Sequence, residues 1–147
     1  MDPAETNFRD GVVVGKCVLL VDDHESVRLG LRRAFESSGF TCVEATHGAH
    51  AIALISHFVP DLIVTDLSMP VMNGLDAATI LRKKLPDTPI ILYTMYAEAS
   101  VQRLATAAGV TAVVSKSDPV GELLRKAHSL VAAVSTVSFD GHDGPMV

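Results

Sequence analysis

Five short apolar runs, each followed by a helical segment, constrain the fold of this chain more than any other feature of its sequence. Each run has the length and composition of a strand that is buried on both faces. The runs lie at residues 17–21, 40–44, 62–65, 90–93 and 111–115. The helical segments lie near residues 24–38, 47–58, 75–84, 98–108 and 118–134. This alternation predicts an α/β fold, in which helices cover both faces of a parallel sheet.

The alternation occupies residues 16–134, and 147 residues are about the length of one domain. Residues 1–15 show no sustained hydrophobic period, so we expect an N-terminal leader outside the folded domain. Residues 135–147 contain two glycines and also lack a period. They are predicted to form a flexible tail or the start of a linker.

Charge and hydrophobicity exclude several classes of protein. Twelve Lys and Arg residues against seventeen Asp and Glu residues give a net charge of −5, which disfavours nucleic-acid binding by this chain alone. No apolar run reaches the roughly 18–20 residues that span a bilayer, and the acidic start of the chain is unlike a secretory signal peptide. Cys17 and Cys42 lie in apolar runs without metal-binding spacing. We interpret them as free thiols of a cytoplasmic protein.

Polar residues with compatible chemistry follow four of the five predicted strands. Asp22 and Asp23 follow the first strand, and Asp66 follows the third. Thr94 follows the fourth strand, and Lys116 follows the fifth. Ligands of open α/β sheets bind outside the carboxyl ends of the strands. The sequence therefore predicts one site that contains all five side chains.

The residue types in this set favour phosphoryl transfer with magnesium. Clustered carboxylates repel one another unless a cation compensates, and oxygen ligands without His or Cys suit Mg²⁺. Lys116 would neutralise one phosphoryl oxygen, and the hydroxyl of Thr94 would donate to another. Asp66 would then attack phosphorus as a carboxylate nucleophile and form an acyl phosphate.

Each residue taken singly also has an ordinary structural interpretation. Asp22 or Asp23 would serve as the N-cap of the following helix, and Asp66 is a common type of turn residue. Lys116 taken alone is more simply an exposed lysine, and threonine is common in strands. The functional hypothesis therefore depends on the complete set.

Three motifs, in this order and at these strand positions, carry a resemblance to a known family. They are LLVDDHE at residues 19–25, DLIVTDLSMPVMNG at residues 61–74 and VSK at residues 114–116. These segments resemble the receiver domain of bacterial two-component response regulators. The resemblance extends over roughly residues 16–134, and it implies a flavodoxin-like fold: five β-α units in a three-layer sandwich with strand order 2-1-3-4-5.

The resemblance also implies residue roles. Asp66 would accept a phosphoryl group from the phosphohistidine of a sensor histidine kinase. Asp23, Asp66 and the backbone carbonyl of Ser68 would bind Mg²⁺ directly, and Asp22 would act mainly through water. Lys116 would contact the phosphoryl group, and Thr94 would move toward it. The domain would be a signalling domain, which catalyses only its own phosphorylation and dephosphorylation, and its output would be a rearranged face around helix 4, strand 5 and helix 5.

Three positions depart from the family pattern. Val113 occupies a position that is usually aromatic and coupled to the switch threonine, and Met95 stands where a small residue is common. Tyr96 is a candidate replacement for the moving ring. Ser117 follows the lysine where the family often has a cis proline, and we expect a trans bond because a non-proline cis bond costs about 2.5–4 kcal/mol.

Several alternatives remain open from the sequence. A flavodoxin-type cofactor module would need a phosphate-binding loop where residues 22–25 are acidic. An aspartyl-nucleophile phosphatase would need a second acid at the position of Ser68. A pseudo-receiver interaction module would explain Val113 and Met95. The receiver would signal to a separate downstream protein or to an output domain that follows in the same chain, and the surfaces of helices 1 and 5 are compatible with a homodimer.

Overall fold

One five-stranded parallel sheet forms the centre of the molecule. The computed structural model describes residues 8–9, 12–13 and 15–143. The strands of the sheet are β3 (Cys17–Val21), β4 (Thr41–Ala45), β5 (Leu62–Thr65), β6 (Ile90–Thr94) and β7 (Ala112–Ser115). They lie in the order β4-β3-β5-β6-β7, which is 2-1-3-4-5 when these five strands are counted along the chain. The flavodoxin-like topology implied by the family resemblance is confirmed.

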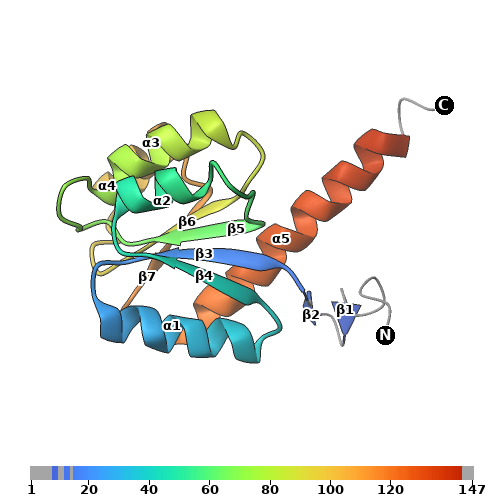
Figure 1. Cartoon of the computed structure of the whole chain (residues 1–147), viewed down its shortest axis with the longest axis horizontal. Coiled ribbons are helices and arrows are strands. Elements are labelled where there is room, and N and C mark those ends of the chain that lie inside the picture. The colour runs from blue at the N-terminus through green and yellow to red at the C-terminus, as the bar shows by residue number, and fades with distance from the viewer. Residues whose placement is uncertain (1–7, 10–11, 14, 144–147) are drawn as a thin grey trace.

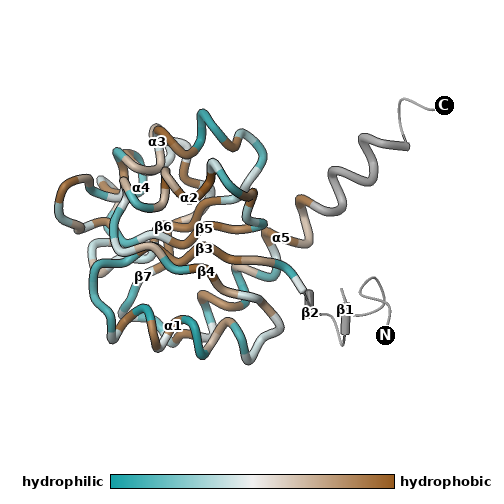
Figure 2. Tube along the Cα trace, in the orientation of Figure 1, coloured by the Kyte–Doolittle hydropathy of each residue, from teal (hydrophilic) through white to brown (hydrophobic). Residues whose placement is uncertain are grey.

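Five helices cover the sheet in two layers, so the domain is a three-layer sandwich. They are α1 (Glu25–Ser37), α2 (Gly48–Leu54), α3 (Gly74–Lys84), α4 (Ala99–Ala107) and α5 (Val120–Asp143). Helices α1 and α5 lie on one face of the sheet, and α2, α3 and α4 lie on the other (Figure 1). The hydropathy pattern follows these layers, because the strands are the most continuously apolar part of the chain (Figure 2).

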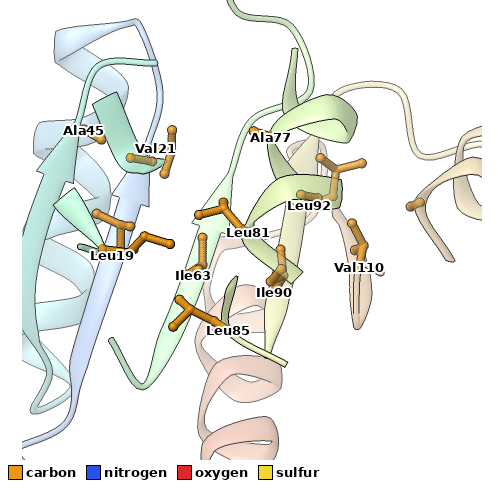
Figure 3. Packing of buried hydrophobic residues seen from close by; sticks show 14 of the residues in the cluster. Leu19, Val21, Ala45, Ile63, Ala77, Leu81, Leu85, Ile90, Leu92 and Val110 are labelled. Carbon is orange, nitrogen blue, oxygen red and sulfur yellow. The ribbon is translucent and has the colours of Figure 1, made fainter. Parts of the chain in front are cut away.

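Two hydrophobic cores lie between these layers because successive strand residues point to opposite faces. On β3, Val18 and Leu20 enter the core beneath α1 and α5, where they meet Phe35. Leu19 and Val21 enter the other core, beneath α2, α3 and α4 (Figure 3). These strand side chains are at most 2% exposed, and burial of one such side chain contributes about 1.5–3 kcal/mol. The sheet is thereby a rigid support for the residues at its edge.

The predicted thiols and the predicted trans bond are both present. Cys17 and Cys42 are free, and Cys42 is buried. No cis peptide bond occurs among the residues that the structure describes, so the bond between Lys116 and Ser117 is trans. Within the same part of the chain, none of the helices has an apolar stretch that would reach across a bilayer.

The structure differs from the predicted elements in three places. Helix α2 ends at Leu54, four residues earlier than predicted, and the hydroxyl of Ser56 donates to the carbonyl of Ala53 in the following turn, at 2.6 Å. Within residues 1–15, Phe8–Arg9 (β1) and Val12–Val13 (β2) form a small antiparallel pair.

At the other end of the chain, α5 continues to Asp143. Residues 135–143 are therefore helical where the sequence predicted a tail, because adding a residue to an existing helix is much easier than nucleating one. The flexibility of this segment and its role as a linker stay predictions, and residues 1–7, 10–11, 14 and 144–147 lie outside the described part of the chain.

Candidate functional site

The register of the sheet brings Asp22 and Asp66 together. Val21 of β3 is paired with Thr65 of β5, so the residue that follows each strand lies at the same edge of the sheet. The backbone N–H of Asp66 donates to the carbonyl of Val21 at 3.0 Å. Asp22 is 2% exposed and Asp66 is 7% exposed, so both carboxylates are almost completely shielded from solvent.

Lys116 reaches both of these carboxylates from the end of β7. Its Nζ atom lies 3.3 Å from Asp22 Oδ2 and 3.3 Å from Asp66 Oδ1. The backbone N–H of Lys116 donates to the carbonyl of Thr94 at 2.8 Å, which attaches the start of the β7–α5 loop to the end of β6. Three of the five predicted side chains are therefore in direct contact.

Burial and charge oppose each other in this cluster. Burial raises the pKa of Asp66, Lys116 opposes this shift, and the charge of Asp22 adds to it. Burial alone would lower the pKa of Lys116, but Asp22 and Asp66 together raise it. The lysine is therefore a firmly held cation, and burial is the main cause of the raised pKa of Asp66.

Asp23 lies at the open side of the cluster, and its setting fits a bound cation. Its side chain is 28% exposed, and its buried Oδ1 atom accepts no hydrogen bond, although the Nδ1 atom of His24 lies 3.2 Å from it. Asp22, Asp23, His24 and Asp66 each offer one ligand atom, and all four atoms lie within 4.8 Å of one another. Oxygen-rich sets of this kind are suited to Mg²⁺, so the residues that are present fit the metal implied by the sequence.

The loop between β5 and α3 forms one wall of an open pocket beside this cluster. The pocket is lined by Asp23, Leu67, Ser68, Met69, Pro70 and Asn73. Asn73 caps α3, since its Oδ1 accepts from Leu75 N and Asp76 N, each at 2.9 Å. Ser68, whose carbonyl is a predicted metal ligand, therefore lies on the pocket wall near Asp23.

Gly74 lets helix α3 approach the backbone of Asp66. Its N–H donates to the carbonyl of Leu67 at 2.8 Å, and a Cβ atom at this position would lie only 2.1 Å from the carbonyl oxygen of Asp66. A side chain here would push the candidate phosphoacceptor out of its position.

Thr94 stands at the same edge, and it is joined to Lys116 through its backbone carbonyl, whereas its hydroxyl is bonded elsewhere. The residue is 1% exposed and ends β6, which lies between β5 and β7. Its Oγ1 atom accepts from the backbone N–H of Tyr96 at 3.0 Å. Contact between Thr94 and a phosphoryl group stays a prediction, whereas the structure places the hydroxyl against the start of the following loop.

Two residues that the sequence did not single out touch the cluster. Arg28, which is 11% exposed, donates from Nη1 to the carbonyl oxygen of Asp22 at 2.7 Å and from Nε to Glu44 at 3.0 Å. The Nδ1 atom of His24 lies 3.2 Å from both Asp22 Oδ1 and Asp23 Oδ1. The proximity of His24 to the acidic pair in the sequence was an available signal, but the direction of the Arg28 side chain was not.

Comparison with known proteins agrees with this geometry. A family model for the response regulator receiver domain matches residues 18–128. The response regulator MprA of Mycobacterium sp. (strain KMS) is 32% identical over 128 residues, which are 87% of this chain and 55% of that protein. The Regulator of RpoS of Escherichia coli K12 is 33% identical over 128 residues, 87% of this chain and 37% of that protein. The chain thus spans about half the length of MprA and less of the second relative.

Solved structures show the same architecture. The chemotaxis protein CheY4 of Vibrio cholerae superposes with a TM-score of 0.76 at 26% identity, over 80% of this chain and 99% of that one. The response regulator TrrA of Thermotoga maritima, in complex with Mg(2+)-BeF, superposes with a TM-score of 0.72 at 31% identity, over 78% of this chain and 98% of that one. With its strand order, its acidic edge and the matching family model, the chain belongs to the response regulator receiver domain family of two-component systems.

Proposed function

We propose that this chain is a phosphoacceptor receiver domain in which Asp66 takes a phosphoryl group from the phosphohistidine of a sensor histidine kinase. The observation that carries this proposal is the bridge from Lys116 Nζ to Asp22 and Asp66, at 3.3 Å each, at the carboxyl edge of the sheet. A buried carboxylate with an adjacent lysine and a cation pocket has the parts that phosphoryl transfer to an acid requires.

In the transfer step, an oxygen of Asp66 forms a bond to phosphorus as the bond from phosphorus to the kinase histidine breaks. The electron pair of the broken bond stays on the histidine nitrogen, and the product is an acyl phosphate. Lys116 supplies a positive charge to the phosphoryl oxygens. Mg²⁺, held by Asp22, Asp23, Asp66 and the carbonyl of Ser68, would supply further charge neutralisation. The same residues catalyse hydrolysis of the acyl phosphate, and we assign no other substrate.

We assign the output to the face formed by α4, β7 and α5. Met95, Tyr96 and Leu104 are 60%, 54% and 58% exposed on α4 and the loop that precedes it, so apolar side chains are available there for a partner. Movement of Thr94 toward the phosphoryl group would break its bond with Tyr96 N and shift this loop. The partner is a downstream protein or an output domain in the same chain. The free thiols of Cys17 and Cys42 support a reducing, cytoplasmic setting.

Intact-mass analysis after incubation with a small phosphodonor and Mg²⁺ tests the proposal. The wild-type chain is expected to gain one phosphoryl group, EDTA is expected to prevent this, and Asp66→Asn protein is expected to stay unlabelled. Asp76→Asn, which alters an exposed carboxylate on α3, is the matched control and should label normally. Absence of labelling in the folded wild-type chain would instead favour a pseudo-receiver that acts only by binding partners.

A further inference from the structure

Tyr93 is a buried aromatic residue that the proposed transfer step does not use. It precedes Thr94 on β6 and is paired with Val114 of β7. The residue is 9% exposed and belongs to the core beneath α1 and α5, together with Val114 and Leu123. Most buried members of this core are aliphatic, and Tyr93 differs from them in offering an aromatic face close to the carboxyl edge of the sheet.

The ring of Tyr93 faces the ammonium group of Lys116. The Nζ atom lies over the ring, 5.8 Å from its centroid, which is within the distance of about 6 Å at which an aromatic face attracts a cation. The same Nζ atom is 3.3 Å from Asp22 Oδ2 and 3.3 Å from Asp66 Oδ1. The Lys116 side chain is only 17% exposed, so little water competes with these contacts. The ammonium group is thereby held between two carboxylates and one aromatic face.

The phenol of Tyr93 adds no negative charge to the site. Burial raises its pKa, the charge of Lys116 lowers it, and Asp118 adds to the increase, so the net effect is a raised pKa. The ring therefore stays neutral at neutral pH. It attracts Lys116 through its π electrons and does not act as a further anion beside the carboxylates.

The contact with the ring differs from the carboxylate contacts, because it does not depend on the state of the site. In the proposed transfer, an oxygen of Asp66 forms a bond to phosphorus, and Asp22 belongs to the set that would hold Mg²⁺. Both acidic partners of Lys116 therefore change during the reaction. Tyr93 takes part in neither process, so its ring can support the lysine before and after transfer.

We propose that Tyr93 is a positioning residue for phosphoryl transfer, because its ring holds the ammonium group of Lys116 in place beside Asp66. Lysine has a flexible stem of four carbons, and a fixed aromatic face restricts the positions that its ammonium group can take. This inference rests on the proposed function, since the position of Lys116 affects labelling only if Asp66 accepts the phosphoryl group.

NMR of the folded, metal-free chain tests the contact without any phosphorylation. The Hε protons of Lys116, assigned by their absence from Lys116→Met protein, are expected upfield of those of the other lysines because they lie near the face of an aromatic ring. The upfield shift should persist in Tyr93→Phe protein, which keeps the ring, and vanish in Tyr93→Leu protein. Absence of the shift in the wild-type chain would overturn the proposal, and this measurement needs no variant of Tyr93.

The mass assay with a small phosphodonor and Mg²⁺ tests the consequence for the reaction. Labelling is expected to slow about three- to tenfold in Tyr93→Leu protein and to change by less than about twofold in Tyr93→Phe protein. In a Lys116→Met background, Tyr93→Leu should cause no further slowing, because the ring acts through the lysine. Phe40→Leu replaces a buried aromatic residue of the same core at the opposite edge of the sheet, and this control should label normally.

The outcomes separate this inference from the function on which it rests. An equal slowing by Tyr93→Leu in the wild-type and Lys116→Met backgrounds would show a general effect on the core and would overturn the proposal. Labelling of Tyr93→Leu protein at the wild-type rate, with Asp66→Asn protein unlabelled, would overturn the role of Tyr93 alone. Absence of labelling in the folded wild-type chain, with the upfield shift present, would instead contradict the phosphoacceptor function.

Discussion

At the scale of single residues, the Asp66 carboxylate is held where its charged form is disfavoured. Burial raises its folded-state pKa above the unfolded value of 3.8, and Lys116 offsets only part of this shift. Between the two pKa values the folded state binds more protons than the unfolded state, so the free energy of unfolding falls as the pH rises through this window. Above the folded-state pKa, the free energy of unfolding has lost the whole contribution of this group and no longer changes with pH because of it. Burial of Asp66 therefore lowers the free energy of unfolding at neutral pH, as is typical of residues at functional sites.

Asp66→Asn is therefore expected to raise the free energy of unfolding near pH 7 in the absence of divalent ions. The gain should disappear below about pH 3, where Asp66 is protonated in both states of the wild-type chain. Urea unfolding followed by circular dichroism, in EDTA at both pH values, measures this difference. The exposed Asp76→Asn variant serves as the control. Loss of stability at neutral pH in Asp66→Asn protein, or a gain that is equal at both pH values, would contradict this account.

Arg28 is a positioning residue for the acidic pair. It holds the Asp22 carbonyl at 2.7 Å, and Glu44 holds the guanidinium in turn, so Arg28→Gln would release the loop that carries Asp22 and Asp23. We expect Mg²⁺ affinity to fall about tenfold, as is typical when support for metal ligands is lost, and Arg28→Lys to recover part of it. Calorimetry on the folded variants checks this. Arg33→Gln, on the exposed side of α1, should bind Mg²⁺ normally, and an equal loss in both variants would refute the positioning role.

The meeting of Asp22, Asp66 and Lys116 was predictable because parallel strands end at one edge of a sheet. The three residues directly follow apolar runs that are easy to recognise. The Arg28 contact was not predictable, since the sequence does not reveal the direction of a long side chain on a half-buried helix. The same limit applies to Thr94, whose hydroxyl accepts from Tyr96 N.

At the scale of elements, the start of α3 is attached to the site by close packing. Gly74→Ala would place a methyl group 2.1 Å from the Asp66 carbonyl oxygen, and neither backbone can yield easily. The variant is expected to lose about 1–3 kcal/mol of unfolding free energy and to label more slowly with a phosphodonor. Denaturant unfolding and the mass assay measure the two effects.

Gly30 provides the matched control for this substitution. It lies within α1, and a Cβ atom there would meet nothing within 4 Å. Gly30→Ala is therefore expected to gain about 0.5–1 kcal/mol of stability from helix propensity and to label like the wild-type chain. Normal stability and labelling in Gly74→Ala protein would show that α3 does not constrain Asp66.

The ends of the elements were less predictable than their existence. The strands were predictable almost to the residue because each is a short apolar run bounded by polar or turn residues. Helix α2 ends early because hydrogen bonds of a turn replace helical hydrogen bonds after Leu54. The helical spacing of apolar residues continues beyond Leu54, so the sequence pattern did not mark this end of the helix. The length of α5 was missed because residues 135–143 have no apolar stripe to mark them as a helix.

At the scale of the whole molecule, α5 packs against the core through residues between Leu123 and Ala132. Among the α5 residues whose side chains the structure describes, Val131 and Ala132 are the last that belong to the core. Deletion of residues 135–147 is therefore expected to change the melting temperature by less than about 3 °C, which corresponds to roughly 1 kcal/mol for a domain of this size. Differential scanning calorimetry of both chains measures this. A drop of 10 °C or more, about 3 kcal/mol, would show that the end of α5 belongs to the folded unit.

The central claim is that Asp66 carries the phosphoryl group. The most direct measurement is peptide mapping of the labelled wild-type chain by tandem mass spectrometry, after borohydride reduction converts an aspartyl phosphate to homoserine. The expected result is homoserine at position 66 and unmodified aspartate at positions 22 and 23. A phosphoryl group on any other residue, with Asp66 recovered unchanged, would contradict the account.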